Sequence, residues 1–257
     1  TLPQEDSKKA LEDANGADFS QSKRWYSQAG TPRLSVTSEY DATRCEYRLH
    51  FDQVCPPTPG QPDKLPQVIP VRMALLDRDG KEMALQLNGE ALGTEAVVSI
   101  TEAEQTLVFE NVPTCPLPSL LRGFSAPVKL EVERSDEQLA FLAANDDDPF
   151  NRWDASQRLY TEALLDLVKS YQAAGGDEAQ MGPLAEGVHA AFTATLTAEG
   201  LDPSLKALAL SLPEMRRARR FIRSLLKSSE HAHTTEAACS APPGLHSRRS
   251  AQSPHRR

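Results

Sequence analysis

The hydrophobic period changes inside the segment from Pro118 to Leu159, and this change constrains the fold more than any other feature. In the first part, Val128, Leu130 and Val132 alternate with charged residues, as in a half-buried strand. After Ser135 the apolar residues recur every three to four positions, which is typical of helices that pack on a core. The chain is therefore expected to be all-β first and all-α afterwards.

Two helix starts follow the change of period. Ser135 and Gln138 have the spacing of a capping box, in which each side chain satisfies a backbone N–H of the other residue. Asp148 is a good N-cap, and Pro149 suits the first position of a helix. The acidic run at 146–148 has the oxygen ligands of a hard cation but not the spacing of a calcium loop, so we interpret it as helix N-terminal charge.

Seven short strands are predicted before this point, separated by turn signals and without helices between them. They cover residues 34–40, 45–51, 68–76, 83–87, 96–100, 106–111 and 126–133. This pattern favours an antiparallel β-sandwich. Further helices are predicted at 149–172, 183–197 and 202–212, and helices joined by short loops suit a bundle or a solenoid.

Composition narrows the functional classes. The chain has 257 residues and a formal net charge of −8, with a basic end after Pro213 and a strongly acidic remainder, which argues against a nucleic-acid partner. Four cysteines without CxxC or zinc-finger spacing argue against a disulfide framework and for a reducing compartment. There is no apolar run of about 20 residues and no signal-peptide pattern, so a cytoplasmic location without a membrane span is expected.

Several motifs resemble those of one family. They are SLLRGFSAPVKL at 119–130, SDEQLAFL at 135–142 and DPFNRWDASQRL at 148–159, preceded by WYSQAGTP at 25–32, PTPGQP at 57–62, IPVR at 69–72 and EQTLVFENV at 104–112. In this order they resemble the join between the immunoglobulin-like third domain and the helical fourth domain of bacterial-type aminopeptidase N, a zinc-dependent alanyl aminopeptidase. The resemblance covers roughly residues 12–213 and ends at Glu214.

The resemblance implies a division of the chain into four parts. Residues 1–31 would be the terminal helices of a missing catalytic domain, and residues 32–134 would form an immunoglobulin-like β-sandwich. Residues 135–227 would be a truncated, solenoid-like helical domain. Beyond the resemblance, the composition of residues 228–257 predicts a disordered tail. Truncation would leave apolar side chains without their normal partners; Leu184, Val188, Ala191 and Leu196 are the ones we expect to be exposed.

Six residues are expected to form the structural junctions between these domains: Trp25, Tyr26, Phe124, Phe150, Arg152 and Trp153. Trp25 and Tyr26 would pack where the first helices meet the sandwich. Arg152 is expected to pair with Asp148 or with the strand domain, and Trp153 to bury a large area. Simple packing without a functional role is the alternative interpretation for each residue.

The catalytic motif of the family is absent from this sequence. A zinc aminopeptidase of this type needs HExxH on a helix, with two His ligands and a Glu as general base. None of the six histidines is followed by Glu, so no catalytic, metal or substrate-binding residue is predicted, and zinc would belong to the full-length enzyme only. We therefore predict a non-catalytic fragment that supplies the domain scaffold of a peptidase whose other domains remove N-terminal amino acids from peptides.

A stand-alone β-sandwich and helical protein-interaction module is the alternative. The basic segment 215–227 reads as an amphipathic helix that suits a partner groove or an anionic membrane, or as a plain exposed helix. His231, His233, Glu236 and Cys239 have metal-ligating side chains but are interpreted as a solvated run. The abrupt change of composition at Glu214 suggests a change of reading frame as a further hypothesis.

Overall fold

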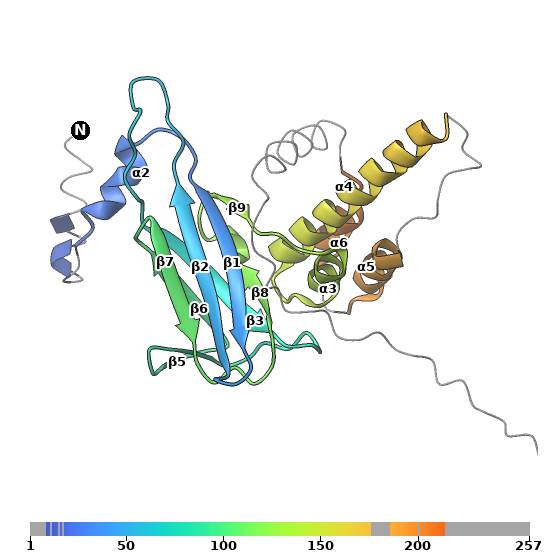
Figure 1. The fold of residues 1–257 in the computed structure, drawn as a ribbon, viewed down its shortest axis with the longest axis horizontal. Coiled ribbons are helices and arrows are strands. Elements are labelled where there is room, and N and C mark those ends of the chain that lie inside the picture. Colours follow the sequence, from blue (N-terminus) through green and yellow to red (C-terminus); the bar gives the residue numbers. More distant parts are fainter. Residues whose placement is uncertain are drawn as a thin grey trace, which may run out of the picture.

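The computed structural model describes residues 9–10, 12–14, 16, 18–175, 186–199 and 201–213. Two β-sheets face each other in the first half, and a group of helices lies beside one end of them (Figure 1). The predicted basic helix at 215–227, the tail at 228–257 and the residues from His231 to Cys239 lie outside the described residues, as does Leu184.

The larger sheet has six strands in the order β5-β4-β7-β2-β1-β9. Its strands are β1 (Arg33–Asp41), β2 (Glu46–Val54), β4 (Leu85–Leu87), β5 (Glu90–Gly93), β7 (Glu104–Phe109) and β9 (Lys129–Glu131). The hairpin of β1 and β2 confirms the prediction for this part of the chain, and Tyr40 lies opposite Tyr47 in its register.

The smaller sheet has three strands in the order β6-β3-β8. Its strands are β3 (Ile69–Leu76), β6 (Glu95–Ile100) and β8 (Leu117–Leu120), all paired antiparallel. The core lies between the two sheets, because alternate residues of each strand are buried there. Its largest fully buried side chains include Tyr47, Phe51, Phe109, Ile69 and Met73.

The sandwich differs from the prediction in two ways. The short strands β5 and β8 were not predicted, because neither has enough residues to show alternation, and β8 contains Pro118. The last strand, β9, spans only Lys129–Glu131 and runs parallel to β1, with Arg33 opposite Lys129. The connection from β6 to β7 crosses between the sheets, since β6 pairs with β3 whereas β7 pairs with β2.

The helices begin where the capping residues predicted. The side-chain and backbone bonds of a capping box join Ser135 and Gln138 at the start of α3 (Asp136–Asn145). Asp148 accepts from the backbone N–H of Asn151 and caps α4 (Pro149–Ala173). They are followed by α5 (Glu186–Thr197) and α6 (Pro203–Leu210). Both α5 and α6 pack against α4, which is the longest helix of the group.

The helical domain has a core of its own. Leu139, Leu142, Leu159 and Tyr160 are buried with Val188 and Ala191 of α5. The expectation that Val188 and Ala191 are exposed is therefore wrong, because both side chains turn inward against α3 and α4. Leu196 is 53% exposed, as expected. Among the described residues, no helix combines the length and the hydrophobicity that a membrane span requires.

Candidate functional site at the domain junction

The sandwich and the helical domain meet over a mixed apolar and polar junction. Leu76, the last residue of β3, belongs to the core of the helical domain, and Leu117 of β8 packs against the same core. One strand thus contributes side chains to both cores, so the two domains share buried surface. Sharing of this kind makes independent motion of the domains costly.

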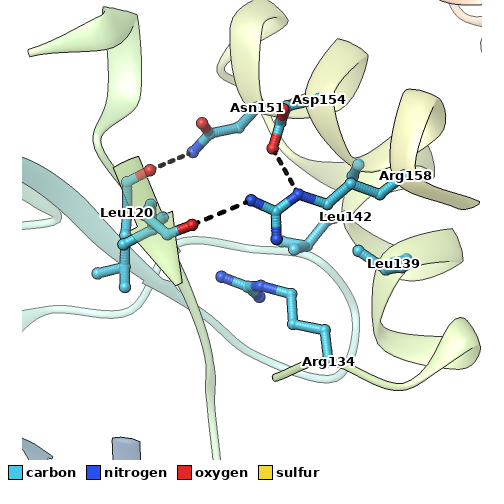
Figure 2. Close-up of a pocket in the computed structure, with 9 residues that line it drawn as sticks. Leu120, Arg134, Leu139, Leu142, Asn151, Asp154 and Arg158 are labelled. Carbon is cyan, nitrogen blue, oxygen red and sulfur yellow. Dashed lines mark hydrogen bonds and ion pairs between the residues drawn. The ribbon is translucent and has the colours of Figure 1, made fainter. Parts of the chain in front are cut away.

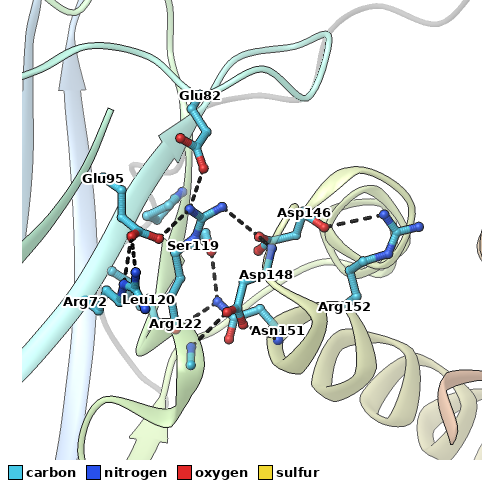
Figure 3. A network of polar contacts seen from close by, with 12 residues as sticks. Arg72, Glu82, Glu95, Ser119, Leu120, Arg122, Asp146, Asp148, Asn151 and Arg152 are labelled. Carbon is cyan, nitrogen blue, oxygen red and sulfur yellow. Dashed lines mark hydrogen bonds and ion pairs between the residues drawn. The ribbon is translucent and has the colours of Figure 1, made fainter. Parts of the chain in front are cut away.

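Arg122 lies at the centre of the polar part of this junction. It follows β8 in the short 3-10 helix η2 (Arg122–Phe124), and its side chain is only 2% exposed. Leu121 adopts a left-handed conformation, with φ of 55°, and thereby turns the chain out of the strand. This turn directs the guanidinium toward Asp146, which lies between α3 and α4 (Figure 3).

The guanidinium of Arg122 joins three carboxylates and one hydroxyl. Nη2 donates to Asp146 Oδ1 at 2.9 Å, and Nη1 donates to Glu82 Oε1 and, at 2.9 Å, to Glu95 Oε2. Nε donates to Ser119 Oγ at 2.9 Å. Glu82 and Glu95 belong to the sandwich, whereas Asp146 lies between α3 and α4, so this one side chain connects the two domains.

These contacts change the pKa of two groups. Burial alone would lower the pKa of Arg122, but the hydrogen bond to Glu82 and the charge of Asp146 raise it above its ordinary value. For Glu82, burial acts to raise the pKa, whereas hydrogen bonds from Thr94 and Arg122 lower it overall. Both groups are therefore held in their charged forms, as a buried ion pair requires.

Asp148 holds the same junction from the start of α4. Its Oδ1 accepts from the N–H of Asn151 and caps the helix, while its Oδ2 accepts from the N–H of Gly123 at 2.8 Å. Asn151 then donates through Nδ2 to Ser119 Oγ at 2.8 Å and to the carbonyl of Leu120 at 3.0 Å. A single helix N-terminus is thus bonded to η2 and to the end of β8 (Figure 3).

The acidic run at 146–148 has two different roles in the structure. Asp148 is the helix cap that the sequence predicts. Asp146, in contrast, has 0% side-chain exposure and is the buried partner of Arg122, which the interpretation as helix charge did not foresee. Its Oδ1 also accepts from the N–H of Asp148 at 3.0 Å.

Arg152 does not make the ion pair that the sequence predicts. Its Nη1 lies 3.4 Å from the backbone carbonyl of Asp146, and its bond to Asp148 involves only the two main chains. Burial lowers the pKa of Arg152, and the charges of Asp146 and Asp147 oppose that change. The pairing fails because Asp148 is already used by the backbone of Asn151 and Gly123.

The aromatic residues form a stack at the edge of the junction. The rings of Phe124 and Phe150 are 5.5 Å apart, and those of Phe150 and Trp153 are 5.7 Å apart, both in tilted arrangements. Phe124 is 54% exposed, and Trp153 is half-buried. The ring of Trp153 lies beside Phe150, and its side chain is partly buried at the junction.

A second junction connects the N-terminal segment to the sandwich. This segment contains η1 (Gln21–Lys23) and α2 (Arg24–Ser27). Trp25 packs against the sandwich core and donates through Nε1 to the carbonyl of Val68 at 2.8 Å. Tyr26 is 79% exposed, so the expectation that it packs at the sandwich is wrong. It follows Trp25 directly in a short helix, which turns its ring to the other side.

Hydrogen bonds between glutamine side chains and backbone groups join the Pro-rich loop at 56–66 to the N-terminal segment. Gln28 donates through Nε2 to the carbonyl of Leu65 at 2.9 Å and accepts from its N–H at 2.7 Å. Gln61 of the loop likewise donates through Nε2 to the carbonyl of Ser27 and accepts through Oε1 from the N–H of Ala29. Neither glutamine was singled out in the sequence, because polar loop residues show no periodic pattern.

The described residues contain no cluster of three or more His, Cys, Asp or Glu side chains that could hold a metal ion. Cys45 and Cys55 carry free thiols. The residues that the structure describes therefore do not fit a zinc site.

Comparison with known proteins gives two family matches. A family described as "Domain of unknown function (DUF3458) Ig-like fold" matches residues 30–133, and one described as "Domain of unknown function (DUF3458_C) ARM repeats" matches residues 136–240. The boundary between them falls at the start of α3. The second match extends beyond Pro213, where the motifs predicted that the resemblance ends.

Similar proteins and structures are aminopeptidases. The chain is 42% identical over 208 residues to "Aminopeptidase N" of Escherichia coli and 39% identical over 210 residues to that of Haemophilus influenzae, covering 80% and 82% of this chain. It spans only 23% of the length of each relative. A structure of Legionella pneumophila aminopeptidase A in complex with aspartic acid matches 89% of this chain and 25% of its own, with 25% identity and a TM-score of 0.65. The chain therefore consists of an Ig-like DUF3458 domain followed by an ARM-repeat DUF3458_C domain and is homologous to the C-terminal region of aminopeptidase N.

Proposed function

We propose that this chain is the scaffold region of a larger, cytoplasmic zinc metallo-aminopeptidase, in which other domains remove N-terminal amino acids from peptides. The observation that carries the proposal is the homology to aminopeptidase N over 80% of the chain but only 23% of the relative. The absence of HExxH from the sequence agrees with a role outside catalysis.

The two junctions explain how such a scaffold works. The N-terminal segment is bonded to the sandwich through Trp25 and Gln28, and the sandwich to the helical domain through Arg122 and Asp148. A domain attached to the N-terminal segment would therefore be held at a fixed position relative to the helical domain. Fixed spacing of this kind matters where one domain covers the active site of another, since small displacements reduce catalysis.

Zinc and the peptide substrate belong to the complete enzyme in this proposal. Zinc would supply a water of lowered pKa for attack on the peptide carbonyl, and its ligands would come from the catalytic domains that precede this region. The residues described here would bind neither metal nor substrate. Their contribution would be to hold the domains of the enzyme in fixed positions.

An interaction module that acts alone is the second candidate, and one observation favours it. Exposed apolar side chains lie on the C-terminal helices and on the residues that follow them: Phe192, Leu196, Leu205, Leu208 and Leu212. A surface of this composition suits a protein partner. In the scaffold proposal the same side chains would contact further helices of an ARM-repeat domain, because each repeat packs on its neighbour.

A chimera tests the scaffold proposal. This chain would replace the homologous region of Escherichia coli aminopeptidase N, and hydrolysis of an alanine arylamide would be measured. We expect the chimera to hydrolyse the arylamide and this chain alone to show no hydrolysis. Arg122→Met in the chimera should reduce activity or its thermal stability, whereas Arg44→Met, at an exposed site, should change neither. A folded but inactive chimera, or activity of the chain alone, would contradict the proposal.

A further inference from the structure

A small pocket lies at the apolar side of the domain junction. Its volume is about 30 Å³, and residues of the sandwich, of the linker and of both α3 and α4 line it. Its walls include Leu120, Leu130, Leu139 and Leu142, together with the charged side chains of Arg134 and Arg158 (Figure 2). Two cations that face a mostly apolar cavity are unusual, because burial penalises charge.

Arg134 has few partners for a buried guanidinium. Its Nη2 donates to the carbonyl of Pro118 at 2.8 Å. Its Nη1 is buried and has no hydrogen-bond partner among the described residues. Burial and, after it, repulsion from Arg158 lower the pKa of Arg134 to about 10. A guanidinium has five N–H donors, and the two on Nη1 are unused among the described residues.

Arg158 approaches the pocket from α4. Its Nε forms an ion pair with Asp154 Oδ2 at 3.0 Å, and its Nη2 lies 3.5 Å from the carbonyl of Leu130. Arg158 is thus directed toward β9, whereas Arg134 reaches β8 through the carbonyl of Pro118 (Figure 2). The side chains of Asp154 and Arg158 are only partly buried, so the pocket is accessible to solvent ions along α4.

The charges around the pocket do not balance. Arg134 and Arg158 carry two positive charges, and Asp154 is the only acidic residue among the described residues that line the pocket. Asp146, whose charge also acts on Arg134, is bonded to Arg122 at 2.9 Å. Within the described lining itself one positive charge therefore remains, and one monovalent anion would neutralise it.

We propose that this pocket binds a small monovalent anion of the size of chloride between the guanidinium groups of Arg134 and Arg158. The volume exceeds the roughly 10–15 Å³ that a cavity of this kind needs to hold one water molecule, so an ion of the size of chloride fits. The anion would accept from Arg134 Nη1 and bridge the linker to α4. This inference goes beyond the scaffold role and is independent of it, since it concerns the junction of this chain alone.

Bromide, which replaces chloride and scatters anomalously, tests the site directly. Crystals of the complete chain would be soaked in sodium bromide, and we expect an anomalous difference peak between the two guanidinium groups. A map with no peak in the pocket, or with adventitious peaks on the surface only, would overturn the proposal.

Stability measurements test the same site in solution. At constant ionic strength, replacing sodium gluconate by sodium chloride should raise the midpoint of thermal unfolding in a saturable way, by about 2–5 °C. Arg158→Gln should abolish this rise, and the matched surface variant Arg44→Gln should retain it. A chloride response of Arg158→Gln equal to that of the unmodified chain would contradict the site. If Arg158→Gln fails to fold, the bromide map decides.

Discussion

Arg122 Nη2 and Asp146 Oδ1 lie 2.9 Å apart, with side chains that are 2% and 0% exposed, and they belong to different domains. Two charges so completely removed from water are stable only as a pair. The pair therefore requires the sandwich and the helical domain to be docked, and it makes the docked arrangement specific.

Removal of one partner should reveal this dependence. Arg122→Met leaves Asp146 buried without its cation, so the free energy of unfolding should fall by about 3–5 kcal/mol. Urea unfolding followed by circular dichroism measures this change. Arg44→Met, at a side chain that is mostly exposed, should change stability by less than about 0.5 kcal/mol. Equal stability of both variants would show that the pair does not join the domains.

Two glycines with the same backbone conformation provide a matched test of the contact between the domains. Gly80 has φ of +82°, and an added Cβ would lie 2.5 Å from Cβ of Asn145 at the end of α3. Gly89 has φ of +78°, and no atom lies within 4 Å of its added Cβ.

Both Gly→Ala variants carry the strain of a positive φ, about 1 kcal/mol. Gly80→Ala should cost at least about 1 kcal/mol more than Gly89→Ala, because only Gly80 contacts the helical domain. Thermal unfolding of the two variants compares them, and similar melting temperatures would rule out a close contact at Gly80.

Glu162 should make stability depend on pH. Burial, and then the hydrogen bond and charge of Asp136, raise the pKa of Glu162 from 4.5 to about 7. The folded protein therefore binds more protons than the unfolded chain between these two values, so the free energy of unfolding falls as pH rises from about 4.5 to about 7.

The stabilising contribution is fully present below pH 4.5 and is lost above pH 7. Glu162→Gln should flatten this part of the profile, whereas Glu133→Gln, at an exposed site, should leave it unchanged. Urea unfolding at several pH values measures both variants. A profile of Glu162→Gln that follows the unmodified chain would contradict the assignment.

Trp153→Ala should have a moderate effect. A fully buried Trp or Phe costs about 3–5 kcal/mol on truncation, but Trp153 is only half-buried, so we expect about 1–2 kcal/mol. Leu142→Ala, at a side chain that is 4% exposed, should cost more, about 2–5 kcal/mol. A larger loss for Trp153→Ala than for Leu142→Ala would mean that the aromatic stack, and not the helical core, stabilises the junction.

Much of the fold was predictable because local signals determine it. The hairpin of β1 and β2 follows from alternation, and the starts of α3 and α4 follow from Ser135 and Asp148. Strands β5 and β8 were missed because four residues are too few to show a period. The parallel pairing of β9 with β1 joins positions about 96 residues apart, and nothing local to either strand specifies it.

The junction was less predictable than the fold. Sequence reasoning selected Arg152, but the buried partner of the acidic run is Arg122, a single charged residue after a strand. The sequence signal for a buried arginine was weak. In SLLRGF, Arg122 stands between apolar residues and a glycine, and the structure has left-handed conformations at Leu121 and Gly123 on either side of it. The pairing depends on the approach of two domains, which a pattern along the chain does not encode.

The intact mass of the native product is the most direct test of the scaffold proposal. It would be measured after capture from the source cells with an antibody against the sandwich, residues 32–134. The proposal predicts a mass far above 28.2 kDa, because this chain matches only 23% of the length of its relatives. A mass near 28.2 kDa would contradict it and would favour a separate interaction module.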